Sequence, residues 1–154
     1  MTFNNITIIS GGQSGVDRAA LDFALENGIH CEGWCPLGRL AEDGIISNKY
    51  PLKQTATSKY EERTRLNIED SDGILILYKN EIDEGTLLVH KIAQEINKHV
   101  LTIKLPVDKL FNEEYLSGWI THNHISKLNI VGPRESSSNG VYKATYNFLK
   151  KLLS

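Results

Sequence analysis

Short apolar runs alternate with longer amphipathic segments along most of the chain. The run at 6–9 is rich in β-branched residues and the run at 73–78 is apolar at nearly every position, so both predict buried strands. Further strands are expected at 30–35, 100–103 and 128–131. Continuous apolar runs of this kind are typical of parallel sheets that are buried on both faces.

Between these runs, apolar residues recur at helical spacing. Five segments are predicted to be helical: 16–27, 60–69, 86–98, 113–124 and a terminal segment that begins at Val141. Strands that alternate with helices imply an α/β fold, with a doubly wound, mostly parallel sheet covered by helices on both faces. In such sheets a ligand binds outside the carboxyl ends of the strands, where the strand order reverses.

Length and composition narrow the class of protein. The 154 residues contain no repeat and no Pro/Ser-rich linker, so we expect a single domain over 1–154. A net charge of −2 gives no general attraction to nucleic acid, and no apolar stretch is long enough for a membrane span. The N-terminus lacks the charged start of a signal peptide, so a cytoplasmic location is expected. Cys31 and Cys35 are expected to be buried, inert thiols, with a metal or redox role as the alternative.

A glycine-rich loop joins the first strand to the first helix. It consists of Gly11, Gly12, Gln13, Ser14 and Gly15. Glycines let a ligand approach the backbone closely, and the free N–H groups at a helix start favour negative charge. We therefore expect an anion, such as a phosphate, on this loop. The alternative is a tight turn that simply needs glycine. The loop matches neither the dinucleotide fingerprint nor the Walker loop, so it does not identify the anion.

Other candidate ligand residues follow the later strands. Gly85 and Thr86 are expected at a second helix start that faces phosphate, although Thr86 would serve equally as a plain N-cap. Arg39 lies in a long segment at 36–58 that shows no period, and such segments are usually functional. Arg63 lies in the polar helix. Arginine binds phosphate in a two-pronged geometry, but a surface arginine is more often solvated.

Familiar catalytic motifs are missing from the sequence. It contains neither a nucleophile elbow nor a zinc-binding helix, so no catalytic residue and no metal ligand is assigned. Asp17 falls in the first turn of the predicted first helix, where a carboxylate suits the helix dipole, and a structural role is favoured over ligand binding. Carboxylates such as Asp83 and Glu84 suit acid–base chemistry, but their spacing does not show that they converge.

Several motifs, in order along nearly the whole chain, resemble those of the molybdenum cofactor carrier family. The longest are Ile9-Ser10-Gly11-Gly12-Gln13-Ser14-Gly15-Val16-Asp17-Arg18 and Gly38-Arg39-Leu40-Ala41-Glu42-Asp43-Gly44, the latter preceded by Gly33-Trp34-Cys35-Pro36. Shorter matches are Arg63-Thr64 with Asn67, Asp70-Ser71-Asp72-Gly73, Gly85-Thr86 and Gly132-Pro133-Arg134-Glu135-Ser136. The family belongs to the SLOG superfamily of Rossmann-like nucleotide-binding proteins, which implies a Rossmann-like fold here.

The resemblance implies a protein that binds the molybdenum cofactor (molybdopterin) and carries or protects it without catalysis. The family's pocket would map onto 12–15, Arg39, Arg63, Gly85 and Thr86. Molybdoenzymes would be the recipients, and a homo-oligomer is expected. One departure is Glu84, which stands where the family usually has the first of two glycines.

Two other functions stay open at this point. The wider superfamily includes phosphoribohydrolases, which release the base from nucleoside monophosphates and carry a glutamate three residues after the loop threonine. In this chain that position is Val89, which cannot stabilise positive charge on a sugar. A nucleotide-sensing module without chemistry is the other alternative.

Overall fold

Five parallel strands form the central sheet of the computed structural model, which describes Met1 and residues 3–153. In sheet order they are β2 (Cys31–Glu32), β1 (Thr7–Ile9), β9 (Lys127–Val131), β7 (Gly73–Tyr78) and β8 (His99–Lys104). The expected α/β fold with a doubly wound parallel sheet is thereby confirmed.

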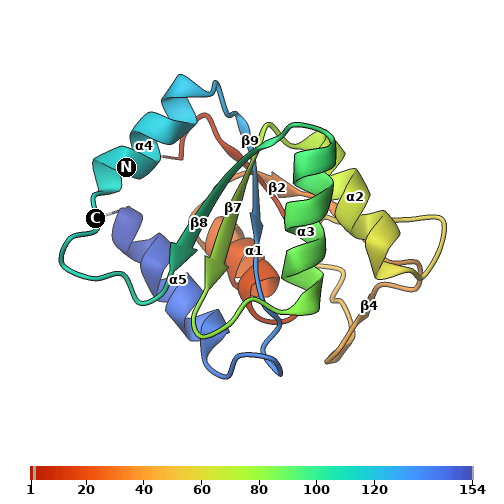
Figure 1. Ribbon diagram of the computed structural model, residues 1–154. Helices are drawn as coiled ribbons and strands as arrows, with labels where there is room; N and C mark the ends of the chain where they lie inside the picture. Colours follow the sequence, from red (N-terminus) through yellow and green to blue (C-terminus); the bar gives the residue numbers. More distant parts are fainter. Residues whose placement is uncertain (2, 154) are drawn as a thin grey trace.

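Helices cover both faces of this sheet (Figure 1). They are α1 (Val16–Glu26), α2 (Tyr60–Asp70), α3 (Glu84–Glu95), α4 (Glu113–His122) and α5 (Val141–Leu152). Helices α2 and α3 pack on one face, where Ile74, Ile76 and Val131 meet Ile68 and Val89. Helices α1, α4 and α5 pack on the other face, and the alternate residues Leu75 and Leu77 of β7 point to them. Burial on both sides explains why β7 reads as one apolar run.

The last strand occupies an unusual place in the sheet. Strand β9 lies between β1 and β7, although it comes last along the chain. If the chain is counted from β9, the order becomes 3-2-1-4-5, which is the standard doubly wound order. The helices that follow β9 and β7 lie on opposite faces of the sheet. The point where the order reverses therefore lies between β9 and β7, and a ligand is expected there.

The segment predicted as one strand at 30–35 is in fact two short strands. Strand β2 joins the main sheet, whereas β3 (Trp34–Cys35) pairs with β6 (Lys53–Gln54) in a separate parallel pair. Gly33 turns the chain between them with φ +153°, and a Cβ there would lie 2.0 Å from the Ser10 carbonyl oxygen. Both cysteines are free and buried, and burial raises the pKa of each thiol, as fits the expected inert role.

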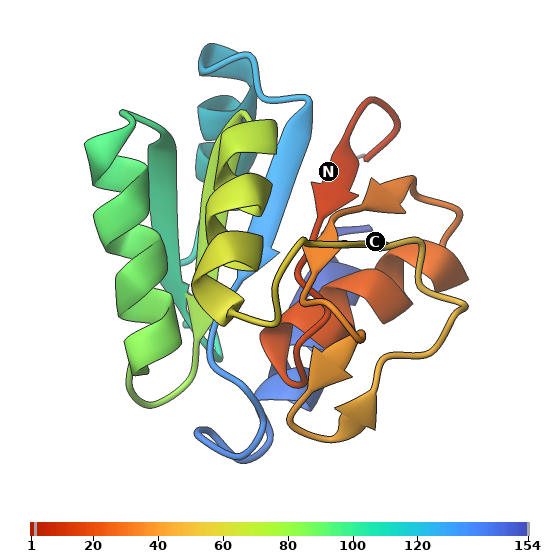
Figure 2. The same ribbon diagram turned by 90° about the vertical axis from the view of Figure 1, so that its right-hand side faces the viewer.

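The long segment at 36–58 is ordered, and not the structureless loop that its lack of period indicated. It holds a hairpin, β4 (Leu40–Ala41) and β5 (Gly44–Ile45), followed by β6. Figure 2 shows this segment beside α1, and Tyr50 Oη donates to the carboxylate of Asp22 in that helix.

Arg39 organises this segment from within. Its guanidinium donates to the backbone carbonyls of Ile46, Ser47, Tyr50 and Leu52, at 2.7–3.0 Å. A segment that is ordered by one guanidinium bonded to several backbone carbonyls has no periodic pattern of apolar residues, so the sequence gives no sign of this order.

No helix among the described residues has the length and apolar character needed to cross a membrane.

Gly132 follows β9, and its Cα lies tightly against neighbouring backbone. A Cβ there would lie 2.0 Å from the Leu77 carbonyl oxygen and 2.6 Å from Val16 Cγ2. We expect Gly132→Ala to lower the free energy of unfolding by about 1–3 kcal/mol, as measured by urea denaturation, because rigid backbone must shift. Gly118→Ala is the control: it is exposed in α4, has nothing within 4 Å of its Cβ, and should gain about 0.5–1 kcal/mol. Equal stabilities for the two variants would contradict this packing.

Candidate functional site

A cleft of about 570 Å³ opens at the carboxyl ends of the central strands, between α2 and α3. This volume lies within the range of small-molecule sites. The loops that follow β1, β7 and β9 line it through Gly11, Gln13, Asp83 and Arg134, and the first turn of α3 adds Gly85. The cleft therefore lies at the reversal of strand order between β9 and β7, where a doubly wound fold places its ligand. The segment at 36–58, which was expected at the same edge, does not line it.

Helix α2 and strand β9 supply the polar wall and floor of the cleft. Asn67 of α2 is fully engaged, because its Oδ1 accepts the Trp34 N–H at 2.8 Å and its Nδ2 donates to the Trp34 carbonyl at 3.0 Å. This pair of bonds fixes β3 to α2. Asn129 of β9 differs: it is 1% exposed, and its Oδ1 has no partner among the described residues.

Arg63 is the buried cation of the cleft. It is 9% exposed, and its Nη1 donates to the Gly11 carbonyl at 3.1 Å. Its Nε is buried and has no partner in the part of the chain that the structure describes. The Tyr60 ring covers the guanidinium, with its centroid 5.2 Å from the central carbon. Buried donors are nearly always satisfied, so the unpartnered Nε is an unusual feature of this cleft.

Asp17 faces Arg63 across the top of the cleft. Its Oδ2 lies 4.0 Å from Arg63 Nη1, and the residue is 8% exposed. Burial raises the pKa of Asp17 to about 6 and Asp83 adds to the rise, whereas Arg63, the Gln13 N–H and Arg18 act in the opposite direction. The sequence favoured a structural role for this residue over metal or hydroxyl binding. The structure places it in the cleft wall.

The amides of the glycine-rich loop are largely occupied by the protein itself. The Gly12 N–H donates to Ser10 Oγ at 3.2 Å, and the Ser14 N–H donates to Gln13 Oε1 at 3.0 Å. The first amide of α1, that of Val16, donates to the Pro133 carbonyl at 3.2 Å. This differs from the expectation of free amides aimed at an anion, because two nearby polar side chains and one backbone carbonyl accept their hydrogen bonds.

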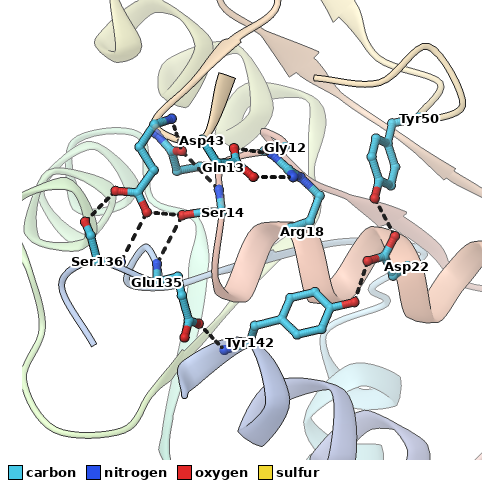
Figure 3. A network of polar contacts seen from close by, with 11 residues as sticks. Gly12, Gln13, Ser14, Arg18, Asp22, Asp43, Tyr50, Glu135, Ser136 and Tyr142 are labelled. Carbon is cyan, nitrogen blue, oxygen red and sulfur yellow. Dashed lines mark hydrogen bonds and ion pairs between the residues drawn. The ribbon is translucent and has the colours of Figure 1, made fainter. Parts of the chain in front are cut away.

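Ser14 belongs to a polar network on the far side of this loop (Figure 3). The Ser14 and Ser136 hydroxyls both donate to the Glu42 carboxylate, and the Glu42 N–H donates to Gln13 Oε1 at 2.9 Å. Although burial acts in the opposite direction, the bonds from Ser136 and Ser14 lower the pKa of Glu42. Glu42 therefore ties the loops that follow β1 and β9 to the β4–β5 hairpin.

Helix α3 begins two residues earlier than predicted, and its N-cap is Asp83, not Thr86. The Asp83 Oδ1 accepts the Thr86 N–H at 2.9 Å and the Thr86 hydroxyl at 2.7 Å. Glu84 and Gly85 open the helix, so their amides have no partner within it. Both residues are exposed and line the cleft.

The structure thus brings together five of the nine residues expected at the site. Gly11, Gln13, Arg63, Gly85 and Thr86 line the cleft. The other four lie elsewhere: Gly12, Ser14, Gly15 and Arg39. Arg39 is displaced because its guanidinium is already bonded to the carbonyls of its own segment.

Two cleft residues, Asp17 and Asn129, were not assigned to the site from the sequence. A signal for Asn129 was present, since it is the one polar residue in the apolar run Leu128-Asn129-Ile130-Val131. An amide side chain inside a buried strand needs a partner, and here the chain supplies none to its Oδ1 among the described residues.

Asp17 is expected to lower the stability of the ligand-free protein. Its pKa rises from 3.8 to about 6 on folding, so the folded state holds the proton more tightly between these values. The free energy of unfolding should therefore fall as pH rises through this window, and the loss persists above it. Asp17→Asn removes the charge, so we expect the variant to be more stable than wild type by roughly 2–3 kcal/mol at pH 8, and equal to it near pH 4. Urea denaturation at both pH values measures this.

Asp43→Asn is the matched control for this measurement. Asp43 is half-exposed, and its hydrogen bonds with Arg18 lower its pKa, so its removal should reduce stability at pH 8. A destabilised Asp17→Asn variant at pH 8 would contradict the effect assigned to burial of Asp17.

Comparisons with known proteins agree with this arrangement. Residues 8–153 match the model of the circularly permutated YpsA SLOG family, whose description fits a strand order that becomes standard when counted from β9. The chain is also similar to a crystal structure titled "Putative molybdenum carrier protein" from Syntrophus aciditrophicus SB. The two are 40% identical with a TM-score of 0.88, over 96% of this chain and 94% of that one. No curated protein matches. Because the family model spans nearly all of its length, this chain belongs to the circularly permutated YpsA SLOG family.

Proposed function

We propose that this protein binds a phosphorylated small molecule in the cleft, and that this ligand is the molybdenum cofactor, which it holds and delivers without chemical turnover. The observation that carries the proposal is the buried Arg63, whose Nε lacks a partner among the described residues and which lines the same cleft as the open start of α3. The similarity to a protein titled as a molybdenum carrier supports the choice of ligand. Molybdoenzymes would then be the recipients.

The phosphate is assigned to the start of α3 and to Arg63, and not to the glycine-rich loop. The amides of Glu84 and Gly85 have no partner within the helix, and the helix dipole favours an anion there. Glu84 is exposed, so its carboxylate has room to turn toward solvent and leave the amides accessible. The departure from the family's paired glycines is therefore compatible with phosphate binding.

The remainder of the ligand is assigned to the inner part of the cleft. Leu88, Val89 and Val131 line it with apolar surface, and Tyr60 stands at the α2 side next to Arg63. Apolar walls with a few polar groups that converge are typical of sites that hold a flat organic ring. A pterin has this shape and polarity.

Arg63 is expected to determine affinity. Arg63→Gln should weaken binding of purified molybdenum cofactor by roughly 10- to 100-fold, because it removes a charge-assisted hydrogen bond to phosphate. Arg65→Ala is the matched control, since Arg65 lies on the same helix, is partly exposed and pairs with Glu95 at 3.6 Å outside the cleft. Anaerobic titration, followed by the cofactor's own absorbance, measures both. Equal affinities of the two variants would refute the assignment of phosphate to Arg63.

We also expect no release of base from nucleoside monophosphates. The position where a hydrolase of the superfamily would carry its glutamate is Val89, which lines the cleft and is 6% exposed. Three carboxylates, Asp17, Asp83 and Glu84, do line the same cleft, so the assay is informative. Incubation of the protein with AMP and GMP, followed by chromatography, should yield no free adenine or guanine. Base release that disappears in Glu84→Gln would instead establish an enzyme.

A further inference from the structure

Two buried hydrogen-bond acceptors in the cleft keep acceptor capacity that the described residues do not fill. Asp17 is 8% exposed, and its closest approach to a cation, 4.0 Å from Arg63 Nη1, is too long for a hydrogen bond. The Gln13 N–H is the hydrogen bond that acts on its carboxylate. Asn129 is 1% exposed, and its Oδ1 has no partner within the described part of the chain. A carboxylate accepts about four hydrogen bonds, so most of this capacity is unused.

Two neighbouring polar side chains of the cleft, those of Asn67 and Thr86, find their partners within the protein, unlike Asn129 Oδ1 and Arg63 Nε. Both ends of the Asn67 amide bond to Trp34, and the Thr86 hydroxyl bonds to Asp83. A buried polar group without a partner destabilises a fold by about 1–3 kcal/mol. An apolar residue at either position would therefore give a more stable fold. The unused acceptors therefore point to donors that arrive with the ligand.

The surrounding charge decides which kind of donor fits. A cationic ligand group at Asp17 would lie beside the Arg63 guanidinium, which is itself buried, and like charges at this distance repel. A metal ion would need further ligands, but no group of three or more His, Cys, Asp or Glu side chains suited to a metal occurs among the described residues. With cations and metal ions excluded, neutral N–H groups of a ligand remain as the donors that suit a carboxylate next to an arginine.

Neutral donors in a flat ligand come in a characteristic pair. A ring N–H next to an exocyclic amino group presents two parallel donors, which match the two oxygens of a carboxylate as the guanidinium fork does. The 2-amino-4-oxopyrimidine edge, which pterin and guanine share, has this arrangement. Asn129 lines the floor of the same cleft, and its Oδ1, which has no partner among the described residues, is the second acceptor assigned to such a ring.

We propose that Asp17 and Asn129 form a ring-recognition site for a heterocycle with a 2-amino-4-oxopyrimidine edge. The inference rests on the proposed function, in that Arg63 and the start of α3 hold the phosphate of the same ligand. It adds the residues that select the ring, with Asp17 as the acceptor of the paired N–H groups and Asn129 as a second acceptor.

The experiment compares two ring probes that carry no phosphate. Pterin has the complete edge, and 4-oxopteridine lacks only its 2-amino group. Titrations at pH 8 keep Asp17 ionised, and isothermal calorimetry or ligand-observed NMR measures each dissociation constant. Wild type should bind pterin about 10-fold or more tightly than 4-oxopteridine, because one member of a bidentate pair is missing in the latter.

Variants identify the residue that makes the distinction. Asp17→Asn should reduce the preference for pterin to less than about 3-fold, because its amide presents one donor where a second acceptor is needed. Asn129→Leu should weaken the binding of pterin itself, because the second acceptor is lost. Asp43→Asn, whose carboxylate pairs with Arg18 outside the cleft, should behave as wild type. Thermal denaturation of each variant shows that it is folded.

The possible failures are distinguishable from failure of the proposed function. If pterin and 4-oxopteridine bind equally, or if neither binds, ring recognition by Asp17 is wrong. Binding of molybdenum cofactor that still depends on Arg63 would then leave the proposed function intact. If pterin is preferred through Asp17 but Arg63→Gln binds the cofactor as wild type does, the ring site stands and the phosphate assignment fails.

Discussion

The cleft depends on a buried ion pair that joins the two faces of the sheet. Asp17 belongs to α1 on one face and Arg63 to α2 on the other, and their charged atoms approach to 4.0 Å above the end of β1. Arg63 also occupies the space beside Gly11, where a Cβ would lie 2.6 Å from its Cδ and Nη1. The guanidinium thus holds the first loop against α2. Neither charge is fully bonded, so this contact leaves polar groups facing the cleft.

The position of β9 makes this contact possible. Because β9 lies between β1 and β7, the helices after β9 and β1 fall on one face, and the helix after β7 falls on the other. The loops that follow these strands therefore diverge, and the backbone at Gly132 passes tightly between Leu77 and Val16. Asn129 points to the α2–α3 side from within β9, beneath this divergence, and becomes the floor of the cleft. Strand order, more than any single motif, places the site.

Sequence reasoning succeeded where the signal is local. The runs at 73–78 and 128–131 and the helix that begins at Val141 follow from periodicity and burial, which each segment shows by itself. The break at Gly33 was missed because it depends on a close approach to Ser10, which is distant in the chain. The amides of Gly12 and Ser14 were expected to be free for a different reason: their partners are close in the chain, but the bonds depend on side-chain conformations that no sequence pattern records.

Asp17 shows how a local explanation can hide a residue of the cleft. An acidic side chain in the first turn of a helix is explained by the helix dipole alone, so the sequence offered no reason to look further. Its burial comes from elements far along the chain, and burial changes its chemistry: the pKa rises to about 6, and the carboxylate keeps unused acceptor capacity. Anything that supplies N–H groups to it binds the folded state alone and stabilises that state by mass action. A ligand that donates N–H groups to Asp17, as we propose, would recover the free energy that the fold loses there, and would couple the stability of the protein to occupancy of its cleft.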